Sequence, residues 1–505
     1  MTASFHLYLA IFLPLGVTPL LAALDKWPGL RDTASVGTAV STFLLVLIVL
    51  RFDLGGTAIE LPVIEVMPGL LLAFGVEPLG LVFALLASGL WIVVAIYAVG
   101  YMRANEEEHR TRFSICFALA IAAALGIAFA ANLFTLFIFY EVLTLSTYPL
   151  VAHKQTPEAR AGARVYLSIL LSTSICFFLV AIIWVWTATG TLDFMPGGVI
   201  EGRIDPGLAP FLLALFAFGI GKAALMPFHR WLPSAMVAPT PVSALLHAVA
   251  VVKAGVFALL KVAVYIFGID YLSRTGASEW LMWVAAASIL IAAAIAITRD
   301  DLKARLAYST ISQLAYVTLG VALANQMGII GGTMQMVMHA MAKITLFMCA
   351  GAIYVTTHKT RVSEMRGLGR QMPWTFAAYL IASFSIIGLP PLGGGWSKLF
   401  LLMSAADAGQ MSMIVVLALG SMLSIAYLLP VAGTALFMPI RRANTLGAAA
   451  VEPITIAVRE APLLCLLPIC ATALGCIALF FFGNDIYNFL LHIPLLPGVP
   501  EAPAP

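Results

Sequence analysis

The sequence predicts an all-α polytopic membrane protein with about fourteen transmembrane helices, because uncharged apolar runs long enough to cross a bilayer recur along the chain. Two further observations agree. Of the 505 residues, 62% are hydrophobic and 10% are charged, whereas a soluble domain averages about 25% charged residues. Lys and Arg also gather in alternate connections between the apolar runs. A soluble protein is excluded, and a net charge of +3 without long basic clusters excludes nucleic-acid binding.

The individual spans follow from the uncharged runs. In chain order we predict them at residues 5–23, 33–50, 78–100, 113–130, 132–151, 164–188, 209–226, 240–268, 278–297, 304–323, 327–355, 374–402, 411–438 and 456–483. A short piece interrupted by prolines, residues 227–239, follows the seventh span.

Charge placement supports this count. Nineteen Lys and Arg residues lie in the connections after odd-numbered spans, whereas the other connections and both termini carry three, Arg51, Arg203 and Arg274. Because positive charge accumulates on the cytoplasmic side of a membrane protein, we expect both termini on the outer side and an even number of spans.

Five cationic residues remain, and all are lysines inside predicted spans. A charge at mid-membrane costs about 2.5–3.5 kcal/mol on insertion scales, so these lysines and one intramembrane glutamate would cost roughly 15–20 kcal/mol if they faced lipid. We therefore expect them to face the bundle interior. A desolvated ammonium can release its proton, whereas a guanidinium stays charged, so buried lysines indicate a proton pathway. The intramembrane titratable residues are Glu141, Lys222, His247, Lys253, Lys261, His339, Lys343 and Lys398.

Some of these residues also have a purely structural interpretation as pairs. Glu141 and Lys222 could form a static ion pair between two spans. His339 and Lys343 are four residues apart, so they share a helix face and could form a static polar cluster.

Three other residues have structural alternatives of their own. His247 lies six residues from Lys253, about 120° away around an ideal helix, and could be a satisfied core histidine. Lys261 could extend to the membrane interface. Lys398 could bond carbonyls that a helix break leaves free.

Prolines predict two broken helices. Proline removes a backbone donor and clashes with the preceding turn, so we expect the span at 209–226 to stop near Met226, before Pro227. Pro390, Pro391 and the glycines that follow interrupt the span at 374–402 in the same way. Irregular backbone at membrane depth is tolerated where protein or a water-filled cavity surrounds it. Paired interruptions near intramembrane lysines indicate an ion pathway.

The breaks also predict the organisation of the chain. Residues 113–268 and 278–438 each contain five predicted spans, with the interruption in the fourth. Because five is odd, the two units would insert in opposite orientations, as inverted repeats do. We expect residues 1–112 to supply three N-terminal helices and residues 439–505 to supply the last helix and a Pro-rich tail.

Five motifs together resemble one family. They are FYEVLTLSTYPLV, GKAALMPFHRWLPSAMVAPTPVSALLHAVAVVKAGV, RLAYSTISQLAYV, HAMAKITLFMCAG and GLPPLGGGWSKLF. They resemble the proton-conducting antiporter-like membrane subunits of Mrp-type cation/proton antiporters, complex I and membrane-bound hydrogenases. Within this family the chain looks most like the D-type subunit of the Mrp antiporters, although His247 is more typical of their A-type subunit and of the largest complex I subunit.

The resemblance implies roles for the intramembrane residues. The strength of a Glu141–Lys222 pair would control proton binding at Lys222. Lys253, with His247 nearby, would be the connecting proton carrier. His339 and Lys343 would continue a hydrophilic axis, and Lys398 would open it to one side. The implied location is the bacterial inner membrane, in a complex with other membrane subunits.

Four functions are possible for a membrane chain with these buried titratable residues. The first is a subunit that exchanges protons for sodium or potassium, and the second is the same pathway driven by electron transfer in a complex I-like or hydrogenase-like assembly. The third, an oxidoreductase in its own right, lacks support because the six cysteines have no cluster spacing and no dinucleotide fingerprint is present. The fourth, an inert scaffold, does not explain the intramembrane charges. No cofactor and no metal are expected.

Overall fold

The computed structural model describes residues 3–57, 59–439 and 457–493. It confirms a polytopic all-α membrane protein, in which eleven described helices are long and apolar enough to cross a membrane. The other three predicted spans correspond to two interrupted helices, described below, and to the more polar α15. Arg441, Arg442 and most of the predicted Pro-rich tail lie outside the described residues.

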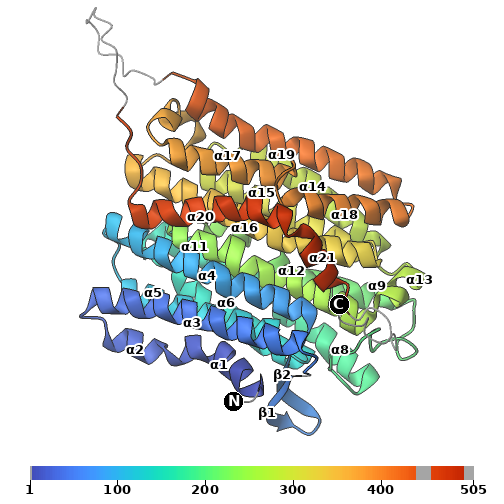
Figure 1. Ribbon diagram of the computed structural model, residues 1–505. Coiled ribbons are helices and arrows are strands. Elements are labelled where there is room, and N and C mark those ends of the chain that lie inside the picture. Colours follow the sequence, from blue (N-terminus) through green and yellow to red (C-terminus); the bar gives the residue numbers. More distant parts are fainter. Residues whose placement is uncertain (1–2, 58, 440–456, 494–505) are drawn as a thin grey trace, which may run out of the picture.

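The N-terminal part forms one edge of the bundle (Figure 1). Its helices are α1 (Ala3–Gly16), α2 (Thr18–Ala23), α3 (Pro28–Leu54) and α4 (Pro78–Ala104). An antiparallel hairpin, β1 (Glu60–Met67) and β2 (Leu70–Gly75), precedes α4. We did not predict this hairpin. Backbone hydrogen bonds from Gly75 to Phe129 and from Ala131 to Ala73 attach it to the next connection.

The first five-span unit contains three π-helical segments within its spans. Its elements are α5 (Arg110–Ala128), α6 (Leu133–Val151), α7 (Pro157–Thr173), η1 (Ser174–Phe178), α8 (Leu179–Thr189), α9 (Ala209–Gly219), η2 (Gly221–Ala223), α10 (Trp231–Ser234), η3 (Ala235–Val237), α11 (Thr240–Ala244), η4 (Leu245–Val249), α12 (Val251–Val262), η5 (Ala263–Phe267) and α13 (Ile269–Thr275). The π-helices are η1, η4 and η5. Such segments are frequent at functional sites, and η4 carries His247.

The second unit lies along the opposite edge of the bundle (Figure 1). Its elements are α14 (Glu279–Thr298), α15 (Leu302–Ala322), α16 (Gln326–Thr357), η6 (Val362–Glu364), η7 (Leu368–Arg370), α17 (Pro373–Ile387), α18 (Gly394–Asp407) and α19 (Met411–Phe437). α20 (Leu463–Phe481) packs on α4, α16 and α17, and α21 (Gly483–Leu490) follows it. The proposed division of the chain at residues 112, 268 and 438 stays a prediction.

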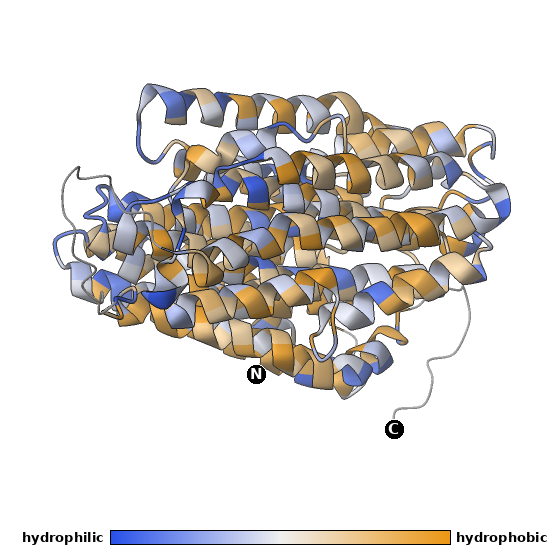
Figure 2. Ribbon diagram, turned by 90° about the horizontal axis from the view of Figure 1, so that it is seen from above, coloured by the Kyte–Doolittle hydropathy of each residue, from blue (hydrophilic) through white to orange (hydrophobic). Residues whose placement is uncertain are grey.

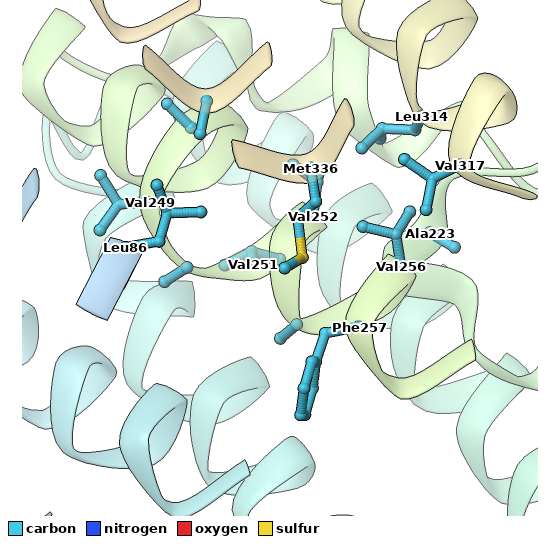
Figure 3. Packing of buried hydrophobic residues seen from close by; sticks show 14 of the residues in the cluster. Leu86, Ala223, Val249, Val251, Val252, Val256, Phe257, Leu314, Val317 and Met336 are labelled. Atoms are coloured by element: carbon cyan, nitrogen blue, oxygen red, sulfur yellow. The ribbon is translucent and has the colours of Figure 1, made fainter. Parts of the chain in front are cut away.

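The core is centred on α12 and α16. Every residue of the span from Thr240 to Phe267 is buried, and in the most apolar stretch of α16 94% of the residues are buried. Around α12, Val252 and Val256 lie on the side of Leu314 and Met336 (Figure 3), whereas the ring of Phe257 packs on that of Phe83, with the centroids 4.8 Å apart. Hydrophobic residues cover most of the helical surface, and hydrophilic residues concentrate towards the two ends of the bundle (Figure 2). The polar groups in the buried parts of α12 and α16 are therefore enclosed by protein.

Candidate functional site: a buried row of lysines

Lys222 lies in the interruption of the first unit. Its Nζ donates hydrogen bonds to the carbonyl oxygen of Tyr140, at 2.8 Å, and to Oγ1 of Thr144, at 2.6 Å. Its backbone N–H, which has no helical partner at this position, donates to the Tyr140 hydroxyl at 3.0 Å. Lys222 is fully buried. Neutral oxygens from α6 therefore hold the ammonium inside the protein.

The predicted position of Lys222 within a helix ending near Met226 was wrong. α9 ends at Gly219, and Lys222 lies in the short 3₁₀ turn η2. Two close backbone contacts explain why α9 ends before Lys222. A Cβ on Gly219 would lie 2.4 Å from the backbone nitrogen of Phe178, and a Cβ on Gly255 would lie 2.2 Å from the backbone nitrogen of Ala223. The chain then passes Pro227 and restarts as α10 at Trp231, as the prolines predicted.

Glu141 follows Tyr140 on α6 but does not form the anticipated ion pair. The ion pairs among the described residues do not include one between Glu141 and Lys222. Both Glu141 carboxylate oxygens are buried and have no hydrogen-bond partner among the described residues. The static ion pair considered as an alternative is therefore absent from this arrangement. Val142 and Leu145, beside Glu141 on α6, are exposed, so Glu141 lies near the outer flank of the first unit.

The centre of the row is a contact between the two units. Nζ of Lys253, on α12, lies 2.7 Å from Nδ1 of His339, on α16, and both side chains are buried. Nε2 of His339 has no hydrogen-bond partner among the described residues. The resemblance implied that His247 lies near Lys253, but the side chain that contacts Nζ of Lys253 is His339.

His247 itself is packed rather than hydrogen-bonded. Its ring lies on that of Phe347, with the centroids 4.6 Å apart, and neither ring nitrogen has a partner among the described residues. The alternative in which His247 is a core histidine with hydrogen-bonded ring nitrogens is therefore not supported. His247 also forms no hydrogen bond to Lys253, in agreement with their predicted angular separation.

Lys343 lies four residues after His339 but turns to another helix. Its Nζ donates to Oγ of Ser309, at 2.7 Å, and to the carbonyl of Leu306, at 3.3 Å, both on α15. His339 and Lys343 are thus not bonded to one another, and the static His–Lys cluster is not formed.

Lys398 lies just after the second interruption, where α17 ends at Ile387 and α18 begins at Gly394. Pro390 and Pro391 lie between them, as predicted. Nζ of Lys398 donates to the carbonyl of Ile387, at 2.8 Å, and to Oγ of Ser421, at 2.9 Å. It therefore does bond a carbonyl freed by the break. It also lines a cavity of about 570 Å³ beside the exposed Leu399, so this end of the row lies near the flank of the second unit.

Lys261 is shielded from solvent. Its side chain is 1% exposed, and its Nζ lies 2.8 Å from Oε1 of Glu77 and donates to the carbonyl of Ala130. The alternative in which Lys261 extends to the interface stays a prediction, because both partners lie at the ends of spans. Glu77 directly precedes α4, and Ala130 lies between α5 and α6. The ion pair thus joins the first unit to the N-terminal helices.

Replacing Glu77 by glutamine is expected to destabilise the protein by about 3 kcal/mol, because it leaves the buried Lys261 without its counter-charge. The double variant Glu77→Gln with Lys261→Met should recover most of this loss, since it removes both charges. Thermal unfolding in detergent measures both effects, with Glu60→Gln on the exposed strand β1 as the control. Equal unfolding temperatures for wild type and Glu77→Gln would contradict this prediction.

Several neutral partners of the lysines were missed. They are Tyr140 and Thr144 at Lys222, Ser309 at Lys343, Ser421 at Lys398, and four further buried polar residues on the same helices, Gln313, Gln335, Ser424 and Tyr427. Their signal in the sequence is weak, because a single hydroxyl or amide in an apolar span does not reveal its partner. Tyr140, Thr144, Ser309 and Gln313 lie within the motifs that carry the family resemblance, and this was the signal that could have found them.

Together, the fold and the row of lysines define a polytopic membrane protein with two interrupted helices and titratable side chains buried between them. The chain matches the family described as “NADH:quinone oxidoreductase/Mrp antiporter, TM” over residues 130–424, more than half of its length. It belongs to this family. The predicted resemblance to antiporter-like membrane subunits is thereby confirmed.

Three relatives illustrate the range of the family. The chain is 32% identical to NADH-quinone oxidoreductase subunit N of Desulforudis audaxviator, over 84% of this chain and 85% of that one. It is 34% identical to the A/B subunit of a probable K(+)/H(+) antiporter of Rhizobium meliloti, over 63% of this chain and 31% of that one. It is 32% identical to hydrogenase-4 component B of Escherichia coli, over 65% and 51% respectively. The chain thus spans about half or less of the last two proteins.

Two solved structures share the fold. A chain of the Mrp complex from Dietzia sp. DQ12-45-1b superposes with a TM-score of 0.84 and 23% identity, covering 97% of this chain and 96% of that one. A chain of the membrane-bound sulfane sulfur reductase, an archaeal respiratory membrane complex, superposes with a TM-score of 0.82 and 24% identity, covering 96% of each. These similarities extend the fold over nearly the whole chain.

Proposed function

We propose that this chain is the proton-translocating subunit of a multisubunit antiporter that exchanges protons for sodium or potassium. The observation that carries the proposal is the contact between Lys253 and His339, 2.7 Å apart, in which both side chains are buried inside the bundle. Buried titratable residues inside membrane spans are expensive and typically mark ion or proton pathways. The relationship to an antiporter protein supports the choice of reaction.

The Lys253–His339 pair holds one positive charge at a time. Two cations this close in a buried site would repel strongly, so either Lys253 is an ammonium donating to a neutral imidazole, or Lys253 is an amine and His339 carries the proton. Moving the proton from Nζ to Nδ1 transfers charge from α12 in the first unit to α16 in the second. The next step needs an acceptor for the proton on Nε2 of His339, such as a water molecule, because this nitrogen has no hydrogen-bond partner among the described residues.

Lys222 and Lys398 are the proposed ends of the row. Each lies at a helix interruption and is held by neutral oxygens, so its charge has no fixed counter-ion and responds to charges brought nearby. Movement of Glu141 towards Lys222 would stabilise the ammonium, and its withdrawal would favour proton release. The membrane potential contributes about 2.3 kcal/mol per charge per 100 mV to such steps.

Other membrane subunits are the proposed partners. Glu141 and the cavity at Lys398 lie at two flanks of the chain where exposed apolar side chains surround them. The Glu141 carboxylate is buried and has no hydrogen-bond partner among the described residues, and a neighbouring protein covering the exposed face of α6 would bring polar groups close to it. We propose a bacterial inner membrane location with both termini on the outer side, from the distribution of Lys and Arg.

A redox-driven assembly is the second candidate function. The chain aligns with 85% of an NADH-quinone oxidoreductase subunit N, and the proton pathway would be the same. Sodium- or potassium-dependent proton flux in vesicles carrying the complete complex favours the antiporter. Copurification of iron–sulfur subunits together with cation-independent, quinone-dependent proton pumping favours the second candidate.

Replacing Lys222 by alanine is expected to abolish proton transport while the complex still assembles, because the variant removes the proton-binding group but no counter-ion. Proton flux in vesicles and recovery of the intact complex are measured together. Lys26→Ala changes an exposed lysine and should transport as wild type. Normal transport by Lys222→Ala would refute the proposed role of Lys222.

A further inference from the structure

A chain of side-chain hydrogen bonds runs through the second unit from Lys343 to the residue before Lys398. All of its members are buried, and they come from α15, α16, α18 and α19. The links run from Lys343 to Ser309 at 2.7 Å, Ser309 to Tyr427 at 3.0 Å, Tyr427 to Ser424 at 3.0 Å, Ser424 to Gln313 at 3.5 Å, Gln313 to Gln335 at 2.8 Å and Gln335 to Ser397 at 2.6 Å.

The two kinds of group in this chain have different chemistry. A hydroxyl both donates and accepts through the same oxygen, so Ser309, Tyr427 and Ser424 can hand on a proton. An amide donates through nitrogen and accepts through oxygen, and amides are not among the side chains that serve as general acids or bases. Gln313 and Gln335 therefore separate a relay of hydroxyls at Lys343 from Ser397, the residue before Lys398.

The direction of the hydrogen bonds supports the same separation. On one side, Lys343 donates to Ser309 and Ser309 donates to Tyr427. On the other side, Ser397 donates to Gln335, Gln335 Nε2 donates to Gln313, and Gln313 Nε2 donates to Ser424. The donors from both sides thus point towards the Tyr427–Ser424 pair, in which either hydroxyl can donate. A proton moving from Lys343 towards Lys398 would require both amides to rotate and exchange their nitrogen and oxygen.

We propose that the Gln313–Gln335 amide pair is a gated barrier in the row: it keeps protons from passing directly from Lys343 towards Ser397 and the Lys398 end, and lets them pass only when both amides rotate. The inference rests on the proposed function, because it assigns these lysines to one pathway. A continuous hydroxyl relay would let protons cross without exchange for a cation. The amide pair prevents this leak and acts as a positioning element between the two lysines.

A carboxylic acid in place of one amide tests the barrier. Gln335→Glu keeps the size of the side chain and supplies an acid that can both donate and accept a proton through its oxygens. The complete complex is placed in vesicles, and proton flux down a pH gradient is measured with choline as the only external and internal cation. We expect Gln335→Glu to raise this leak on the order of a hundredfold over wild type, a typical contribution of a positioned acid–base group.

Control variants separate the barrier from general damage. Gln335→Met removes the amide without adding an acid and should not leak. Thr310→Val removes a buried hydroxyl of α15 that donates within its own helix, to the carbonyl of Leu306, and should behave as wild type. Gln313→Glu and Gln335→His are second acid–base substitutions, for use if Gln335→Glu does not assemble.

A leak in any assembled acid–base variant, with tight vesicles for Gln335→Met, supports the barrier. Tight vesicles for every assembled acid–base variant overturn it, as does an equal leak in Gln335→Met. Cation-coupled proton flux of the wild type is measured in parallel. Its absence would refute the proposed antiporter function, and the leak comparison would still decide whether the amide pair is a barrier.

Discussion

Replacing Lys253 by methionine is expected to reduce proton transport by roughly two orders of magnitude or more, the scale of a lost acid–base group. Lys253 contacts a second proton-binding side chain directly, through Nδ1 of His339, and so links the two units. Methionine has a similar length and carries no charge, so the buried position loses its proton-binding group without acquiring an unpaired polar atom of its own. The protein should therefore remain folded.

Two comparison variants make this result specific. Lys253→Arg keeps the positive charge but does not release it, because the guanidinium stays protonated, so it should be as inactive as the methionine variant. Lys26→Met alters an exposed lysine of a connection and should transport normally. Proton flux in vesicles is the measurement. Near-normal flux for Lys253→Arg would show that a fixed charge suffices at this position and that no proton is exchanged there.

Gly255→Ala is expected to cause a large loss of stability from a single added methyl group, about 3 kcal/mol or more. Its Cβ would lie 2.2 Å from the backbone nitrogen of Ala223 and 2.3 Å from the carbonyl carbon of Lys222. These atoms belong to the η2 turn, so neither can move aside by a change of rotamer. The helix α12 would have to shift, and the hydrogen bonds of Lys222 to Tyr140 and Thr144 would be lost with it.

Thermal unfolding in detergent and proton flux in vesicles test this prediction together. Gly433→Ala is the matched control, because no heavy atom lies within 4 Å of its added Cβ. Alanine is also favoured over glycine inside a helix by about 0.5–1 kcal/mol, so Gly433→Ala should be neutral or slightly stabilising. A Gly255→Ala protein with wild-type stability and flux would contradict the close packing at η2.

Much of the architecture could be predicted because the physical rules involved are local. An apolar run of about 20 residues crosses a bilayer regardless of its neighbours, and a proline ends a helix by its own geometry. The positions of the spans, the interruptions at Pro227 and at Pro390 and Pro391, and the membrane class all followed from such rules. The end of α9 at Gly219 did not, because it depends on close contacts with Phe178 and with α12.

The sequence by itself determined which titratable groups enter the membrane, because the cost of burying a charge is set by residue type and depth. Only the tertiary structure decided what each group contacts: His339 rather than His247 beside Lys253, neutral oxygens rather than Glu141 around Lys222, and Glu77 beside Lys261. The physical reason is that a hydrogen bond forms over about 3 Å. Its partners come from helices far apart in the chain, whose relative position depends on packing along their whole length.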